Sequence, residues 1–306
     1  GDDRADRGEA ERVAHRLVEA GVLAVVGSYS SDATEPAARV YDEAGVLQIT
    51  PSATATRLSE PGYKKFFRTC FVDDRQGEFA ANLMVNKMDK RRIALIHDNT
   101  AYALGLAEWT RKYLEELKGQ IVLFTAIRPG QRDFTGLLND IRAAQVEAVY
   151  FSAYFPEAGL FVKQMKEAGL ADVQFVGGDA IVSAGFIDAA GVQAAAGTVV
   201  TSMPQPGDLP YPETEKFVDD YLAKYGEQPT SIYALTAADA FKLIVEAIEE
   251  TGSDNPALWA DYLHNLDTMA GITGPIVGFN EKGERQGNIY AAYQVNPAGE
   301  FVAFKP

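Results

Sequence analysis

Several features are scarce or absent in this sequence of 306 residues, and each absence narrows the possible functions. Cysteine occurs once, at Cys70, which excludes a disulfide within the chain and leaves the redox compartment open. The 28 basic residues are outnumbered by 43 acidic ones, and the net charge of -15 argues against nucleic acid and against anionic membrane surfaces as partners. No stretch approaches the roughly 20 apolar residues of a membrane span, and no signal sequence is recognisable at the start. We therefore expect a soluble monomer that does not insert into a membrane and whose signal sequence, if it had one, is not present in this chain.

Catalytic and metal-binding motifs are also lacking. The chain has no Gly-x-Ser-x-Gly elbow, no phosphate loop, no Gly-x-Gly-x-x-Gly after a strand and no His/Cys spacing typical of a metal site. His97 beside Asp98 is the one candidate base, but it closes a predicted strand, where a histidine is more often a packed residue. We expect no cofactor, no metal and no enzymatic activity.

What the chain does contain is a regular alternation of strands and helices over a length that suits two lobes. The first expected element is a helix at 9–20, so we expect that an earlier strand-helix-strand unit is missing from lobe one. Strands are expected at 22–26, 46–49, 66–69, 91–97, 121–126, 148–152, 173–177, 198–201, 289–295 and 301–304. Helices are expected at 75–88, 102–117, 134–144, 157–168, 181–189, 213–225, 231–251 and 256–266, and another begins near Asp32. This order predicts an α/β protein with doubly wound parallel sheets.

Two copies of a strand, a hydroxyl-rich loop and a helix start occupy residues 22–54. The first strand, 22–26, is a continuous apolar run, as expected of a strand buried on both faces. Asp32 reads as the N-cap of the following helix, and Thr54 can cap the turn after the second strand. Loops at the carboxyl ends of neighbouring parallel strands lie side by side, so Ser31 and Thr54 together favour a site for a carboxylate. The alternative is that both hydroxyls only cap helices.

Further polar and aromatic side chains follow other strands at the same end. Asp73, Tyr102, Tyr154 and Asp179 each come shortly after a predicted strand, where ligands of open α/β sheets bind. Taken singly, the acids can be helix caps and the tyrosines can be packing residues. Taken together, hydroxyl donors, an acid and aromatic walls suit a zwitterion, with Asp179 accepting hydrogen bonds from its ammonium group.

Several segments resemble the periplasmic leucine/isoleucine/valine-binding proteins of bacterial ABC importers. The resemblance runs from the first helix to the last strand and is carried by residues 25–31, 50–54, 66–69, 94–98, 154–157 and 274–275. It implies the type I periplasmic-binding fold, with two lobes joined by a three-segment hinge that closes on the ligand. Lobe one is expected at 1–72 and 203–277, and lobe two at 73–202 and 278–306.

The same resemblance implies roles for individual residues. Ser31 and Thr54 match the carboxylate-binding hydroxyls, and Asp179 matches the acid that binds the amino group. The other residues expected to contact the ligand are Tyr29, Ser52, Ala53, Asp73, Tyr102, Tyr154 and Tyr233. The family's opening strand-helix-strand and a cysteine pair of some members have no counterpart here, and Tyr29 stands where a member can have an aliphatic residue.

The predicted function is therefore capture of a branched-chain or other apolar amino acid in the periplasm and its delivery to an ABC permease. The alternative is a ligand-sensing regulator or receptor domain for amides or amino acids. No DNA-binding helix-turn-helix and no membrane helix supports that alternative in this sequence.

Overall fold

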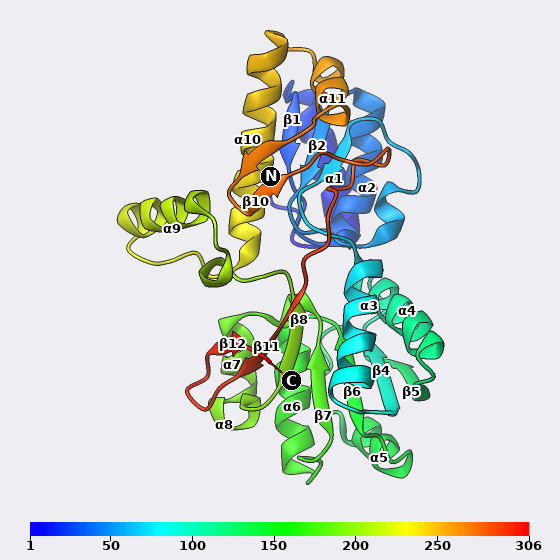
Figure 1. Ribbon diagram of the computed structural model, residues 1–306. Helices are drawn as coiled ribbons and strands as arrows, with labels where there is room; N and C mark the ends of the chain where they lie inside the picture. Colours follow the sequence, from blue (N-terminus) through cyan, green and yellow to red (C-terminus); the bar gives the residue numbers. More distant parts are fainter. Residues whose placement is uncertain (306) are drawn as a thin grey trace. The chain divides into compact units, whose positions relative to one another are not determined.

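The computed structural model describes residues 1–305 and divides the chain into two compact units (Figure 1). Unit 1 comprises Gly1–Val72 and Pro204–Ile289, and unit 2 comprises Asp73–Met203 and Tyr290–Pro306. The third junction lies at 289/290 rather than at the expected 277/278. The reason is that the segment after residue 278 follows unit 1: the Arg68 amide donates to the Gly283 carbonyl (2.9 Å), and the Arg285 amide donates to the Arg68 carbonyl (3.3 Å).

Unit 1 contains a parallel sheet of three strands in the order β1-β2-β3. Its strands are β1 (Ala24–Val26), β2 (Leu47–Thr50) and β3 (Phe66–Arg68). The expectation that the first strand is buried on both faces is wrong, because Val26 is 38% exposed and the preceding Leu23 is 44% exposed. β1 stands at the end of the sheet and pairs only with β2, whereas β2 lies in the middle and is buried throughout.

Five helices and a hairpin complete unit 1. They are α1 (Arg7–Glu19), α2 (Ser31–Ala44), α9 (Pro212–Tyr225), α10 (Ile232–Thr251) and α11 (Pro256–His264), with the short turns η1 (Thr56–Ser59) and η4 (Pro206–Asp208). β9 (Met269–Gly271) and β10 (Gly274–Ile276) form an antiparallel hairpin. The sequence analysis missed this hairpin, whose turn is held by the buried Asp239 carboxylate: it accepts from the amides of Ile272 (2.5 Å) and Thr273 (3.0 Å).

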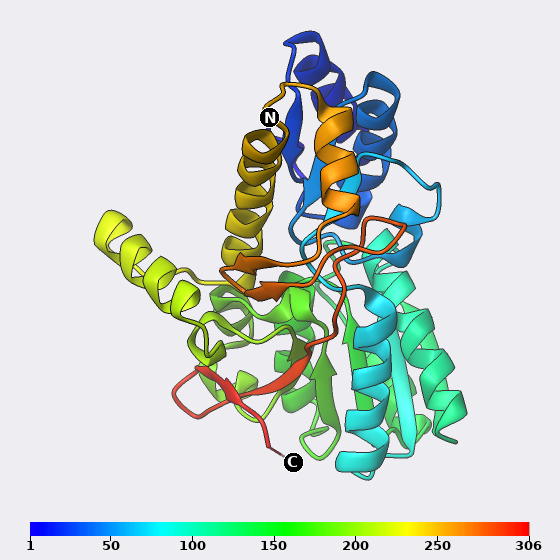
Figure 2. The same ribbon diagram turned by 45° about the horizontal axis from the view of Figure 1, so that its top comes forward.

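The core of unit 1 lies between its sheet and the helices α10 and α11. Leu47, Ile49 and Phe67 of the sheet pack against Leu243 of α10 and Trp259 of α11. Figures 1 and 2 both show α9 extending away from this sheet, and Thr214 is the only buried residue of that helix.

Unit 2 contains a sheet of seven strands in the order β12-β11-β8-β7-β6-β4-β5. The parallel strands are β4 (Arg92–His97), β5 (Gln120–Ala126), β6 (Ala148–Ser152), β7 (Gln174–Gly177) and β8 (Val199–Ser202); β11 (Ala291–Val295) and β12 (Phe301–Ala303) add an antiparallel edge. The helices are α3 (Asp73–Asn82), α4 (Ala101–Glu116), α5 (Thr135–Ala143), α6 (Phe155–Glu167), α7 (Ala184–Ala190) and α8 (Val192–Ala195), with a π-helical turn η2 (Leu83–Lys87) after α3 and a 3₁₀ turn η3 (Asp179–Ile181).

Both faces of this sheet are buried. Ile93 and Leu95 of β4 belong to a core with α3 and α4, while Ala94 and Ile96 belong to a second core with α5, α6 and α7. Side chains alternate across a strand, so this division assigns helices to both faces and confirms the doubly wound α/β class. The single helix expected at 181–189 is instead the short turn η3 followed by α7.

Candidate functional site

The loops that follow β1 and β2 in unit 1 lie against each other. The Ser52 hydroxyl donates to the Tyr29 carbonyl (2.9 Å), and the Thr50 hydroxyl donates to the Ser28 carbonyl (2.9 Å). The amide of Ala53 in turn donates to the Thr50 hydroxyl (3.1 Å). These bonds fix the two loops side by side at the carboxyl ends of neighbouring parallel strands, where amides at helix starts favour anions.

Neither of the two predicted carboxylate-binding hydroxyls caps a helix. The N-cap of α2 is Ser30, whose hydroxyl accepts from the Ala33 amide (3.3 Å), so the prediction that Asp32 caps this helix is wrong. The helix begins earlier because Ser30 has the extended backbone that an N-cap requires. Ser31 follows the cap, and its hydroxyl accepts from the Ala55 amide (3.3 Å) of the second loop.

Thr54 is the more informative of the two hydroxyls. Its side chain is buried, with 3% of the residue exposed, and its Oγ1 has no hydrogen-bond partner among residues 1–305. The turn η1 that follows has no side-chain cap, so the capping role considered for Thr54 is wrong. A buried hydroxyl without a partner is rare and costs free energy, which makes it a natural contact for a ligand.

Two aromatic rings stand beside this pair of loops. Tyr29 and Tyr233, the latter in the first turn of α10, contact each other edge to face with ring centroids 5.8 Å apart. Tyr29 is 55% exposed. The structure therefore brings together the unit 1 members of the predicted site, namely Tyr29, Ser31, Ser52, Ala53, Thr54 and Tyr233.

Unit 2 carries the predicted acid and its aromatic neighbours. Asp179 is the first residue of η3 and follows β7 and Gly178. Its Oδ1 accepts a hydrogen bond from the phenol of Tyr102, which lies in the first turn of α4 (2.8 Å). The Tyr154 ring, at the N-cap of α6, lies 5.5 Å from the Tyr102 ring. Tyr102 and Asp179 are both buried, so their hydrogen bond is shielded from water.

Asp73, the fourth predicted residue of unit 2, opens α3 and is fully buried. Asp73 and Asp179 lie close enough to Tyr150 for both charges to raise the pKa of its phenol. Burial raises the pKa of the Tyr150 phenol, and the charges of Asp179 and Asp73 raise that pKa further.

Three residues of this buried polar region were missed by the sequence analysis. The phenol oxygen of Tyr150, in β6, lies 3.4 Å from the Thr201 hydroxyl. The side-chain amide of Gln76 donates to the Thr201 carbonyl (3.0 Å) and to its hydroxyl (3.1 Å). All three are buried, and they occupy elements whose pattern predicts core. The polar residues Tyr150 and Thr201 inside otherwise apolar strands were the available signal.

His97 is a packed residue. It is buried, its ring lies 5.0 Å from that of Phe124, and its Nδ1 accepts from the Asn99 amide (3.2 Å). Burial lowers its pKa, because the charged imidazolium is poorly solvated there. Because its ring is packed against Phe124 and its Nδ1 already accepts a hydrogen bond, the geometry does not favour a catalytic base.

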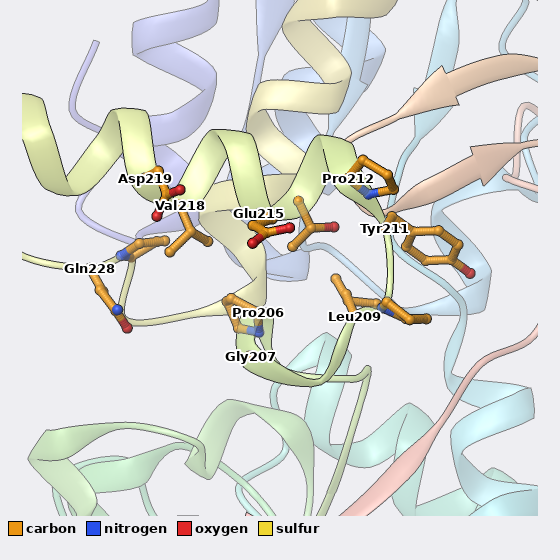
Figure 3. A pocket seen from close by; sticks show the side chains of 12 residues that line it. Pro206, Gly207, Leu209, Tyr211, Pro212, Glu215, Val218, Asp219 and Gln228 are labelled. Carbon is orange, nitrogen blue, oxygen red and sulfur yellow. The ribbon is translucent and has the colours of Figure 1, made fainter.

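A cavity elsewhere in unit 1, with a volume of about 490 Å³, contains none of the predicted site residues (Figure 3). It lies between α9 and the segments 206–211 and 228–229, with Glu215 and Asp219 on the helix side. Its one buried polar side chain, Thr214, donates to the Ile272 carbonyl. This cavity therefore offers no unsatisfied buried group to a ligand.

Two further features are absent from residues 1–305. Within that range, no cluster of three or more His, Cys, Asp or Glu side chains is arranged to hold a metal ion. Nor does any helix in this part of the chain combine the length and the apolar character needed to cross a membrane.

Comparisons with known proteins agree with one another. A family model described as "Periplasmic binding protein" matches residues 1–300. The leucine-, isoleucine-, valine-, threonine-, and alanine-binding protein of Pseudomonas aeruginosa is 34% identical over 293 residues, covering 96% of this chain and 77% of the relative.

Solved structures give the same result. A leucine binding protein LivK from Thermotoga maritima superposes with a TM-score of 0.92 at 26% identity, covering 99% of this chain and 85% of the other. The branched-chain amino acid transporter substrate binding protein LivJ from Streptococcus pneumoniae, in complex with isoleucine, gives 0.88 at 30% identity, covering 99% and 84%. These likenesses confirm the expected two-lobed α/β fold.

Proposed function

Because the chain belongs to the periplasmic binding protein family, we propose that it binds an amino acid with an apolar side chain outside the cytoplasm and delivers it to an ABC permease. The relatives that it matches are named as amino-acid-binding proteins, and one is solved with isoleucine. The observation that carries the proposal is the buried Thr54 hydroxyl without a partner, next to Ser31 at the ends of two parallel strands.

The ligand's carboxylate is assigned to unit 1. Its oxygens accept hydrogen bonds from the Ser31 and Thr54 hydroxyls and from backbone amides of the loop containing Ser52 and Ala53. A charge-assisted bond of this kind satisfies the buried Thr54 hydroxyl and is roughly twice as strong as a bond between neutral groups. The exposed ring of Tyr29, supported by Tyr233, offers an apolar contact to the ligand's side chain.

The ligand's ammonium group is assigned to unit 2. Asp179 accepts from it, with the Tyr102 phenol already bonded to one carboxylate oxygen, and Asp73 adds negative charge. Tyr154 extends the aromatic surface beside Tyr102. These residues hold and orient a ligand without a positioned nucleophile or base, which supports a binding function and not catalysis.

Calorimetric titration with leucine, isoleucine and valine tests the proposal. We expect the parent protein to bind at least one of them, and Thr54→Val and Asp179→Asn to weaken binding by about tenfold or more, because each removes a bond to a charged group. Thr251→Val and Asp188→Asn serve as matched controls, since Thr251 bonds within α10 and Asp188 is exposed. Binding by the Thr54 and Asp179 variants that equals the parent's would refute the assignment.

A further inference from the structure

We propose that Gly178 is a positioning residue for ligand binding, because the missing side chain at this position allows Tyr102 to hold the Asp179 carboxylate. The inference rests on the proposed function, since it concerns the acid that accepts from the ligand's ammonium group. It assigns a binding role to a residue that contributes no functional group of its own.

The backbone at Gly178 does not require glycine. Its φ of -76° and ψ of 176° form an extended conformation open to any residue. What requires glycine is the space beside it: a Cβ at position 178 would lie 2.5 Å from the Tyr102 phenol oxygen and 3.1 Å from Leu106 Cδ2. Contacts this short force a neighbouring side chain to move.

The phenol approaches the backbone because of the length of its partner. Aspartate has a single methylene, so the Asp179 carboxylate stays close to its own backbone, and a donor that reaches it must pass next to residue 178. The Tyr102 hydroxyl donates to Asp179 Oδ1 (2.8 Å) and also accepts a hydrogen bond from the Ala180 amide (3.4 Å). The phenol is thus hydrogen-bonded to two consecutive residues of the turn that follows β7.

Tyr102 has little room to retreat from an added methyl group. Tyr102 is only 3% exposed, and its ring contacts that of Tyr154. Leu106, one helical turn further along α4, is fully buried. Interiors are close-packed, so one added carbon displaces the phenol instead of being absorbed. Displacement breaks the bond that fixes the carboxylate, and the ligand must then order Asp179 on binding, which weakens affinity.

A double-mutant cycle tests this mechanism by calorimetry with leucine. We expect Gly178→Ala and Tyr102→Phe each to weaken binding by about tenfold, the value of one hydrogen bond to a charged group. In the Tyr102→Phe background the Gly178→Ala change should cause little further loss, because the colliding oxygen is gone and the nearest ring carbon, Cζ, lies 3.7 Å from the added Cβ. The contact that remains, 3.1 Å to Leu106 Cδ2, involves no residue of the proposed binding site. Gly136→Ala is the control, since a Cβ there meets nothing within 4 Å.

A second measurement needs no ligand. With tyrosines labelled at Cζ with ¹³C, the Tyr102 resonance, assigned by its loss in Tyr102→Phe, should shift in Gly178→Ala and stay in place in Gly136→Ala. The inference is overturned if Gly178→Ala binds leucine like the parent, if its loss is equally large in both backgrounds, or if the Tyr102 resonance does not move. A parent that binds no amino acid would refute the proposed function, while the resonance would still decide whether Gly178 positions Tyr102.

Discussion

His97 illustrates at the scale of one residue how burial makes stability depend on pH. Because burial lowers its pKa in the folded protein, the unfolded chain, with a histidine pKa near 6.5, binds a proton more readily. Stability is therefore fully present above about pH 6.5 and is lost as the pH falls from there towards the folded pKa. Urea unfolding between pH 8 and pH 5 should show a smaller loss for His97→Gln than for the parent.

The exposed His15 provides the matched control for this prediction. His15→Gln should lose as much stability as the parent over the same range, since this variant keeps the buried His97. An equal pH dependence in the parent and in His97→Gln would show that His97 is not the group responsible.

The location of single residues was predictable from sequence where their position relative to a strand determined where they lie. Ser31 and Thr54 were placed next to each other because each follows a strand at the same end of the sheet, a relation that topology alone fixes. Tyr150 was missed because its position inside a strand indicates only burial, and the hydrogen bond to Thr201 comes from a strand 51 positions further along the chain. Contacts between distant segments depend on side-chain angles that a linear pattern does not contain.

At the scale of the element, α10 shows where periodicity fails. Apolar residues recur at helical spacing along it and predict one broad buried face, carried by Ala234, Ala237, Ala238, Phe241, Ile244, Val245 and Ile248. Of these only Ile244 is buried, while Phe241 is 62% exposed and Leu243 is fully buried. The helix is apolar around most of its circumference, so the hydrophobic pattern predicts its existence but not which side packs on β1 and β2.

This correction can be tested by two truncations of the same helix. Leu243→Ala should lower the free energy of unfolding by about 2–5 kcal/mol, because it leaves a cavity in the core of unit 1. Phe241→Ala should change it by only about 0.5 kcal/mol, as is usual for an exposed position. Urea unfolding followed by circular dichroism measures both, and a larger loss for Phe241→Ala would reverse the assignment of the two faces.

At the scale of the whole molecule, the predicted binding groups are divided between two units with separate cores. Unit 1 provides the hydroxyls Ser31 and Thr54, and unit 2 provides the acid Asp179 with Tyr102. If one zwitterion uses both sets, the chain binds a single ligand, and losing either set removes most of the affinity. If each set instead bound a ligand of its own, the chain would bind two, and a substitution in one unit would leave binding by the other intact.

Calorimetry and thermal unfolding separate these cases. We expect one leucine per chain and a melting temperature that rises with leucine concentration, since a ligand at 100 times its Kd adds about 2.7 kcal/mol to the folded state. Thr54→Val and Asp179→Asn, although located in different units, should each remove about half of that gain or more, because a tenfold weaker Kd leaves about 1.4 kcal/mol. Two binding events per chain, or a rise that either substitution leaves undiminished, would mean that the carboxylate and ammonium sites do not serve the same molecule.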